Sequence, residues 1–158
     1  MNPLSLIPYR PSFSIYGTPS ASRFDTARRV EELPIYLKAK EFSVAVIEIL
    51  GGSKLRGDRD LWQQINDAND SVLSNMSEGF EQGSDAGFAK YLVCAKGSVA
   101  EVVTRLRSAR DKNYITADQL ATREGLGEAL GAMLGGFIRY LRQSDFRNRG
   151  WHKIGNEE

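Results

Sequence analysis

The sequence predicts an all-α fold: an antiparallel up-down-up-down four-helix bundle preceded by an extended N-terminal tail. Apolar residues recur at alternating steps of four and three along four successive segments, which is the spacing of one helix face. Residues that cap or break helices separate each segment from the next. No segment of useful length alternates with the period of a strand. Because the connecting turns are short, consecutive helices should run in opposite directions.

The chain of 158 residues is long enough for one domain with its own core. Residues 1–32 hold four of the five prolines and no sustained apolar period, so we predict a flexible, Pro-rich tail. Residues 33–142 form the predicted bundle. Residues 143–158 form a basic, polar tail.

The first two predicted helices are bounded by residues with a clear local role. Gly51, Gly52 and Ser53 end the first helix, and Asp58 is a good N-cap for the second. The second helix ends between Gly79 and Gly83. The core positions of the first helix are Ile35, Ala39, Phe42, Val46 and Ile49. Those of the second are Leu61, Ile65, Ala68, Val72 and Asn75.

The third and fourth predicted helices begin at recognisable caps. Ser84 caps the third, with Asp85 placed to complement the helix dipole. The capping box TADQ at residues 116–119 opens the fourth. The core positions of the third helix are Phe88, Leu92, Ala95, Val99, Val102, Leu106 and Ala109. Those of the fourth are Leu120, Leu126, Leu130, Met133, Phe137 and Leu141.

The fourth predicted helix also carries a stripe of glycines, Gly127, Gly131 and Gly135. Each glycine inside a helix costs about 1 kcal/mol relative to alanine. We therefore predict that another helix backbone approaches closely along this stripe. A loosely formed helix is the alternative.

The first and fourth predicted helices have more apolar surface than one core face requires. An apolar face outside the core is typical of a contact with another protein, and self-association is the simplest such contact. The additional residues of the first helix are Tyr36, Leu37, Val44, Ile47 and Leu50. Those of the fourth are Ala129, Leu134, Ile138 and Tyr140.

The composition limits the environment and the partners of the protein. Its 21 Lys and Arg residues nearly balance 20 Asp and Glu residues, so net charge gives no general argument for nucleic-acid binding. The single cysteine, Cys94, cannot form an internal disulfide, which fits a reducing compartment. No run reaches the roughly 18 apolar residues of a membrane span. We expect a cytoplasmic protein.

The residues that could carry enzyme chemistry do not form a plausible site in the sequence. The only histidine, His152, lies in the C-terminal tail, so neither Ser98 nor Cys94 has an obvious base to activate it as a nucleophile. We expect Cys94 to pack near the bundle as an unreactive thiol. In the predicted bundle, Glu78 and Glu101 would lie roughly 22 Å apart, at 1.5 Å per residue. That separation is too large for a shared metal. We predict a protein that is not an enzyme and has no catalytic residues, cofactor or metal.

Nucleic-acid binding is a stronger candidate, because the turns after the first and third predicted helices lie at the same end of the bundle. Seven lysines and arginines gather at that end. Four aspartates, Asp58, Asp60, Asp111 and Asp118, also lie there, which leaves an excess of three positive charges. A solvated helix end with no partner is the alternative. The candidate residues are Lys54, Arg56, Arg59, Arg105, Arg107, Arg110 and Lys112.

Several motifs, in this order, resemble a known family. They are SVLSNMSEG at residues 71–79, Phe88 and Leu92, AKGSVAE at residues 95–101, and Tyr114 with Ile115. They resemble the four helix bundle protein family, whose best-known members are encoded in intervening sequences of bacterial large-subunit ribosomal RNA genes. The resemblance covers residues 33–142. Its structural motif residues are Asn75, Glu78, Gly79, Gly97, Ser98 and Glu101. We expect the polar members to be partly buried and to bond to neighbouring backbone or to another subunit.

The resemblance implies a ring of subunits, a homopentamer. A related branch, the accessory variability determinant of diversity-generating retroelements, forms a basic pentamer that joins a reverse transcriptase to its template RNA, and residues 128–139 are similar to its last helix. Many family members carry two arginines in the second helix where this chain reads NDAND at residues 66–70, which disfavours phosphate binding there.

Two functions follow. One is an RNA-associated adaptor, with structured RNA and a reverse transcriptase as partners. The other is a structural protein-interaction module that binds no nucleic acid.

Overall fold

The structure, a computed structural model, describes residues 27–143. It contains a short 3-10 helix, η1, at Val30–Glu32, and a five-residue helix, α2, at Ser53–Gly57. Residues 27–143 contain no strand, which confirms the all-α prediction. The predicted tails at residues 1–26 and 144–158 lie outside the described residues. The four long helices are α1 (Pro34–Leu50), α3 (Arg59–Glu81), α4 (Asp85–Asp111) and α5 (Ala117–Gln143).

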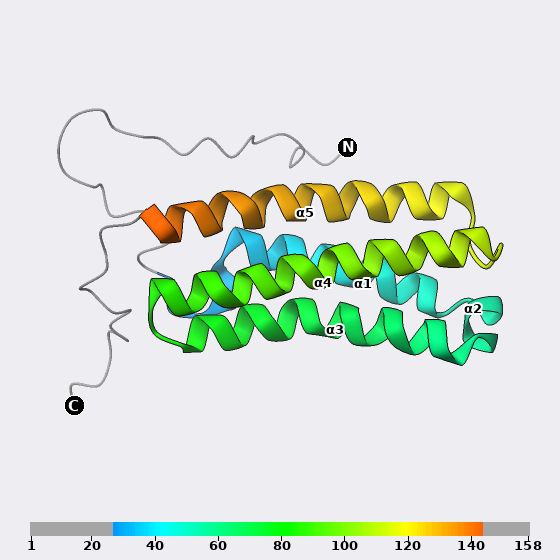
Figure 1. The fold of residues 1–158 in the computed structure, drawn as a ribbon, viewed down its shortest axis with the longest axis horizontal. Coiled ribbons are helices and arrows are strands. Elements are labelled where there is room, and N and C mark those ends of the chain that lie inside the picture. The colour runs from blue at the N-terminus through cyan, green and yellow to red at the C-terminus, as the bar shows by residue number, and fades with distance from the viewer. Residues whose placement is uncertain (1–26, 144–158) are drawn as a thin grey trace.

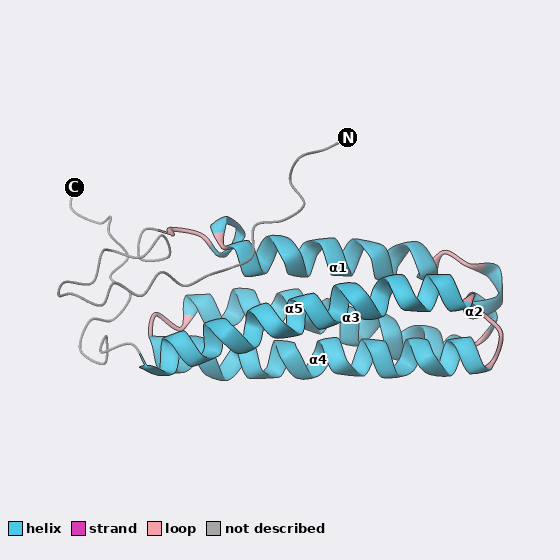
Figure 2. Ribbon diagram, turned by 90° about the horizontal axis from the view of Figure 1, so that it is seen from above, coloured by secondary structure: helices cyan, strands magenta, loops and turns pink. Residues whose placement is uncertain are grey.

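The four long helices lie side by side and form one elongated body (Figure 1). The chain reverses direction after α1, after α3 and after α4, and α2 lies within the first of these reversals. The view turned by 90° shows the same alignment (Figure 2). Each long helix packs against two of the others: α3 and α5 both contact α1, and α3 and α5 both contact α4.

The helices begin where the sequence places their caps. The Asp58 carboxylate accepts a hydrogen bond from the Leu61 amide (3.2 Å), and the Ser84 hydroxyl accepts one from the Gly87 amide (3.2 Å). At the start of α5 the Thr116 amide donates to Gln119 Oε1 (2.8 Å) and the Gln119 amide donates to Thr116 Oγ1 (3.1 Å). These reciprocal bonds form the predicted capping box.

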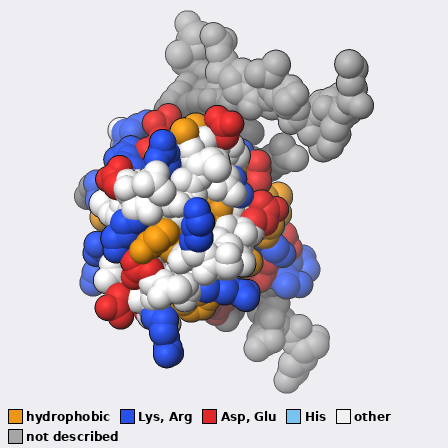
Figure 3. Space-filling view, turned by 90° about the vertical axis from the view of Figure 1, so that its right-hand side faces the viewer, with side chains coloured by type: hydrophobic (Ala, Val, Ile, Leu, Met, Phe, Trp, Pro, Cys, Tyr) orange, Lys and Arg blue, Asp and Glu red, His pale blue; other side chains and the backbone are white. Residues whose placement is uncertain are grey.

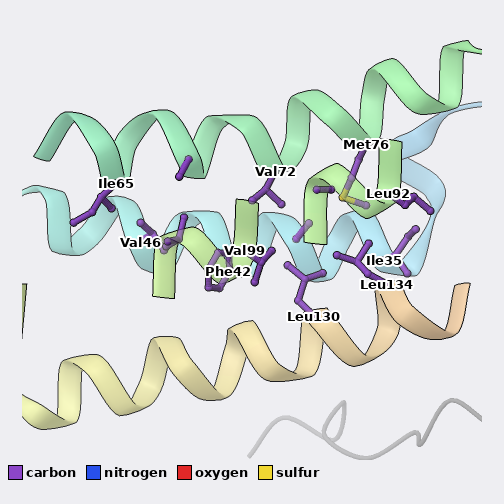
Figure 4. Packing of buried hydrophobic residues seen from close by; sticks show 14 of the residues in the cluster. Ile35, Phe42, Val46, Ile65, Val72, Met76, Leu92, Val99, Leu130 and Leu134 are labelled. Carbon is purple, nitrogen blue, oxygen red and sulfur yellow. The ribbon is translucent and has the colours of Figure 1, made fainter. Parts of the chain in front are cut away.

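Side chains from all four long helices fill a single core (Figure 4). The predicted core positions of α1 and α4 are all buried. One prediction for α3 is wrong: Met76 is buried, whereas Asn75 is only half-buried. The three-residue step to Asn75 would continue an ideal heptad, but a straight helix of 3.6 residues per turn brings the four-residue step to Met76 inward. Of the α5 predictions, Leu120, Leu126 and Met133 are half-buried, and the others are buried.

The packed region begins before residue 33, earlier than predicted. Val30, the first residue of η1, and Leu33, which directly follows η1, are both buried against the core. The sequence also failed to predict α2, whose single buried side chain, Leu55, joins the same core. A bond from Trp62 Nε1 to the Leu50 carbonyl (3.0 Å) links α3 to the end of α1. This bond and Leu55 hold α2 against the end of the body.

Two polar contacts that the sequence did not predict tie α1 to its neighbours. Asn69 on α3 is 0% exposed, and its Nδ2 donates to Ser43 Oγ on α1 (3.0 Å). Arg123 on α5 donates from Nε to the Ala45 carbonyl (2.9 Å) and pairs with Glu48 at 3.0 Å. Both bonds cross between helices, so they favour one register of α1 over others.

The predicted close backbone approach along the glycine stripe of α5 is not found: even at Gly127, the most closely packed of the three, the neighbouring atoms belong to side chains. A Cβ at Gly127 would lie 3.0 Å from Val103 Cγ2 and 3.3 Å from Phe42 Cε2. At Gly131 it would meet nothing within 4 Å, and at Gly135 the nearest atom would be Lys96 Nζ at 3.5 Å. Of the three glycines in this stripe, only Gly127 is packed closely by side chains of other helices.

The closest helix approach occurs instead at Gly79, between α3 and α4. A Cβ there would lie 2.5 Å from Tyr91 Cβ and 3.0 Å from Phe88 Cδ2. The atom in the way at Tyr91 is the one attached to the backbone, so it cannot move by rotating the side chain. Gly97, in the middle of α4, is exposed and has open space around it.

Candidate nucleic-acid interface

Six of the seven predicted basic residues lie at the end of the body that contains α2 and the α4–α5 turn (Figure 1). We call this end the basic end. Arg105 lies apart from the others, about 9 Å along α4 from Asp111 at 1.5 Å per residue. The end-on view shows Lys and Arg side chains around the basic end, with Asp and Glu side chains between them (Figure 3).

Ion pairs occupy three of the seven side chains. Lys112 Nζ lies 2.7 Å from Asp58, and Arg107 Nε lies 2.6 Å from Glu124. Arg105 lies 3.8 Å from Glu101 one turn earlier on α4, and its Nε is buried. The pairs of Lys112 and Arg107 link separate elements of the body, whereas that of Arg105 lies within α4. Arg105 is the weakest of the predicted contacts to a ligand.

The remaining basic residues are better placed to meet an anion. Lys54 and Arg56 on α2 and Arg59 at the start of α3 are exposed, and no ion pair to them occurs among residues 27–143. Arg110 donates to the neutral Asn113 side chain (3.4 Å) and not to a carboxylate. The unpredicted helix α2 thus presents two of the charges. The only sequence signal for it is Leu55, an apolar residue between polar ones.

The pair between Lys112 and Asp58 changes the acidity of both groups. The hydrogen bond from Lys112, followed by the bond from the Leu61 amide, lowers the pKa of Asp58 below its ordinary value of 3.8. The same bond, seen from Lys112, raises the pKa of that ammonium above 10.5. At any pH between these two pKa values both groups are charged. The ion pair of Lys112 with Asp58 then links the α4–α5 turn to the start of α3.

Replacing Asp58 with asparagine tests this link by its dependence on pH. Asparagine keeps the N-cap, so the expected loss of thermal stability comes from the ion pair alone and is small. Since the folded pKa of Asp58 is depressed, its contribution is present above pH 3.8 and is lost as the pH falls through the folded value. The melting temperatures of Asp58→Asn and wild type should differ at pH 7 and converge as the pH falls below 3.8 and through the folded pKa of Asp58. A difference that is independent of pH would contradict this assignment.

A shallow cleft of about 560 Å³ opens at the basic end, between the α1–α2 turn and the α4–α5 turn. Lys54 enters it from α2 and Arg110 from the end of α4. Asn113, Tyr114 and Thr116 line it from the α4–α5 turn. Asn113 has a positive φ of 59°, which turns the chain sharply between Arg110 and the start of α5.

The family-motif residues lie elsewhere, along the contact between α3 and α4. The Ser98 hydroxyl donates to Ser71 Oγ (3.0 Å), and Asn75 Nδ2 donates to Ser71 Oγ (2.9 Å) and to the Ser71 carbonyl (2.7 Å). The Tyr91 hydroxyl donates to Glu78 Oε1 (2.9 Å), and this bond raises the pKa of Tyr91 above 10.0. The motif therefore joins α3 and α4 through side chains.

Two expectations for these motif residues need correction. Glu78 and Glu101 are exposed rather than partly buried, because they lie at the outer edge of the α3–α4 contact. Glu78 bonds to a tyrosine side chain, not to backbone. Gly97 faces open space, so no contact within the described chain explains it.

Other predicted chemistry can be compared with the described residues. Cys94 is exposed, not packed against the body as expected for an unreactive thiol. Within residues 27–143, no three His, Cys, Asp or Glu side chains gather closely enough to hold a metal. The helices described between residues 27 and 143 include none that is long and apolar enough to span a membrane.

A second surface feature is an exposed apolar stripe on α1. Leu37, Val44 and Ile47 are 58%, 50% and 55% exposed. Leu37 and Val44, with Leu126 of α5, also line a groove of about 460 Å³ between the two helices. The other additional apolar residues do not extend it far: Leu50, Leu134 and Ile138 are buried, Tyr36 and Tyr140 are half-buried, and Ala129 is exposed.

The fold and these surfaces define an all-α protein with a basic end and an exposed apolar stripe. Comparison with family models identifies the family: residues 31–136 match the family described as 23S rRNA-intervening sequence protein, and the chain belongs to it. This confirms the family that the motifs at residues 71–79 and 95–101 suggest. A search of curated proteins finds no match. The relation to the accessory variability determinant stays a prediction.

Proposed function

We propose that this protein is a non-enzymatic adaptor, an antiparallel four-helix bundle that assembles into a homo-oligomeric ring and binds structured RNA through its basic end. The observation that carries the proposal is the set of exposed charges on α2 and at the start of α3. Lys54, Arg56 and Arg59 point into solvent without ion pairs among the described residues. Phosphate contacts by such side chains supply most sequence-independent affinity for nucleic acid.

Assembly would multiply this charge. The apolar stripe of Leu37, Val44 and Ile47 supports self-association, because exposed aliphatic side chains of this size gathered on one helix face are typical of protein contacts. In a pentamer, the number that the family resemblance implies, the basic ends of all subunits would combine into one cationic surface. A reverse transcriptase that uses the bound RNA is the protein partner of this proposal.

A salt series tests RNA binding directly. Fluorescence polarisation of a labelled RNA hairpin, measured from about 50 to 300 mM salt, should show an affinity that falls linearly on a double-logarithmic plot. The double variant Arg56→Ala with Arg59→Ala should bind more weakly and lower that slope by about 1.5 for each subunit that contacts the RNA, since each lost phosphate contact removes roughly 0.7–0.9.

The matched control removes the same charge elsewhere. Lys90→Ala with Arg139→Ala takes two exposed cations from the other half of the body, and it should leave both affinity and slope close to wild type. Equal losses in the two double variants would mean that binding is diffuse and would contradict a specific basic end.

The second candidate function, a protein-interaction module without nucleic-acid binding, is favoured by the apolar stripe alone. It predicts no RNA binding even at low salt, together with a stable oligomer. Sedimentation of the same samples separates the assembly from the RNA question. A well-folded particle of 17.6 kDa at micromolar concentration would contradict the ring in both functions.

A further inference from the structure

The cleft at the basic end combines two kinds of chemistry. Lys54 and Arg110 line it with positive charge, and no Asp or Glu is among its lining residues. Tyr114 adds an aromatic ring, and Asn113 adds an amide with both donors and an acceptor. Cations beside an aromatic ring are the recurring combination of sites for single-stranded nucleic acid, where phosphates meet the cations and bases stack on the ring.

The surroundings hold this combination in place. Lys112 Nζ lies 5.9 Å from the centroid of the Tyr114 ring, and Lys112 is itself fixed by its bond to Asp58. Tyr114 is half-buried against the core, so its ring is held with part of its surface toward the cleft. A bound base would therefore meet a ring that loses little freedom on binding.

The positive charge in the cleft comes from the side chains of Lys54 and Arg110. At the start of α5, the amides of Thr116 and Gln119 already donate within the capping box, at 2.8 and 3.1 Å. A phosphate in the cleft would find its two cations in Lys54 and Arg110. The volume of about 560 Å³ lies within the range of roughly 300–1,000 Å³ typical of ligand sites, which is enough for one nucleotide unit.

We infer that this cleft binds one nucleotide of a single-stranded stretch of RNA, with its phosphate between Lys54 and Arg110 and its base against Tyr114. The inference rests on the proposed function, because the rest of the basic end supplies the general attraction for RNA. It adds a preference for unpaired nucleotides, since a base in a duplex has no free face to stack on the ring.

The experiment uses the full chain and a labelled, unstructured 12-nucleotide RNA, with anisotropy at about 50 mM salt. Tyr114→Leu removes the ring and should weaken binding by about 5- to 150-fold, the range for loss of one stacked base. Tyr114→Phe keeps the ring and should bind within about two-fold of wild type. Lys54→Ala with Arg110→Ala should weaken binding and lower the salt slope by about 0.7, the contribution of the one phosphate that the two side chains share.

Circular dichroism of each variant separates misfolding from lost contacts. Because Tyr114→Leu and Tyr114→Phe both lack the tyrosine hydroxyl, a difference between them reports on the aromatic ring alone. The inference is overturned if Tyr114→Leu binds the single strand as wild type does. It is also overturned if a duplex of the same sequence binds equally well. If, in those cases, Arg56→Ala with Arg59→Ala still binds RNA more weakly than wild type, the proposed RNA binding by the basic end is supported, although the cleft has no part in it. If wild type binds no RNA at low salt, both fail.

Discussion

The Gly79→Val variant is expected to lose about 3 kcal/mol of unfolding free energy, the upper part of the usual range for overpacking. The added Cβ would lie 2.5 Å from Tyr91 Cβ, and the two methyl groups beyond it would press on Phe88. Tyr91 cannot relieve the contact by changing its rotamer. The helices α3 and α4 must therefore separate, which also weakens the bond from Tyr91 to Glu78. Urea unfolding followed by circular dichroism measures the loss.

The control is the same substitution at Gly97. A side chain there would meet open space, and glycine and valine are both poor helix formers, so stability should change by no more than about 0.5 kcal/mol. Comparable losses at the two positions would show that the effect arises from valine itself and not from the close approach at Gly79.

The second large effect is expected from Asn69→Asp, which places a carboxyl where the side chain is 0% exposed. Asn69 Nδ2 donates to Ser43 Oγ at 3.0 Å, and its Oδ1 has no hydrogen-bond partner. An ionised carboxylate there lacks a cation and loses its hydration, so about 3–5 kcal/mol of unfolding free energy should be lost at pH 7.

This loss should depend on pH with a defined sign. Burial raises the pKa of the introduced carboxyl above its unfolded value of about 3.9. The folded state then binds a proton that the unfolded state releases, so the deficit relative to wild type is small below pH 4 and grows as the pH rises. Asn69→Leu with Ser43→Ala replaces both partners by apolar groups and should stay within about 1 kcal/mol of wild type. An Asn69→Asp deficit that shrinks with rising pH would disprove the burial argument.

The parts of the fold that sequence predicts well are those fixed by local chemistry. Ser84 and Thr116 can satisfy free helix amides wherever they occur, so they mark the starts of α4 and α5 without tertiary information. The apolar faces of α1 and α4 follow the same logic, because each face must be buried against something. The step from Val72 to Met76 rather than Asn75 depends on how straight α3 runs, which the neighbours of the helix decide.

The candidate site was less accessible to prediction. Proximity of the two turns follows from helix lengths, so the basic end was predictable as a group. The pairing of Lys112 with Asp58, 54 residues apart, depends on side-chain conformations that the spacing does not determine. Asn69 follows Ala68 on the buried face of α3, and nothing in the sequence distinguishes it from a surface polar residue. Its role depends on Ser43, which lies opposite on α1. The cleft required α2, which is too short to leave a periodic signal.

Val30 and Gln143 both lie at the end of the body that carries the α3–α4 turn (Figure 1). That end is roughly 40 Å from the basic end, the length of the 27 residues of α4 at 1.5 Å each. A fluorophore or an affinity handle joined beside either residue would therefore stand well clear of anything held between Lys54 and Tyr114. A label at that end would therefore leave the basic end accessible in the RNA-binding experiments.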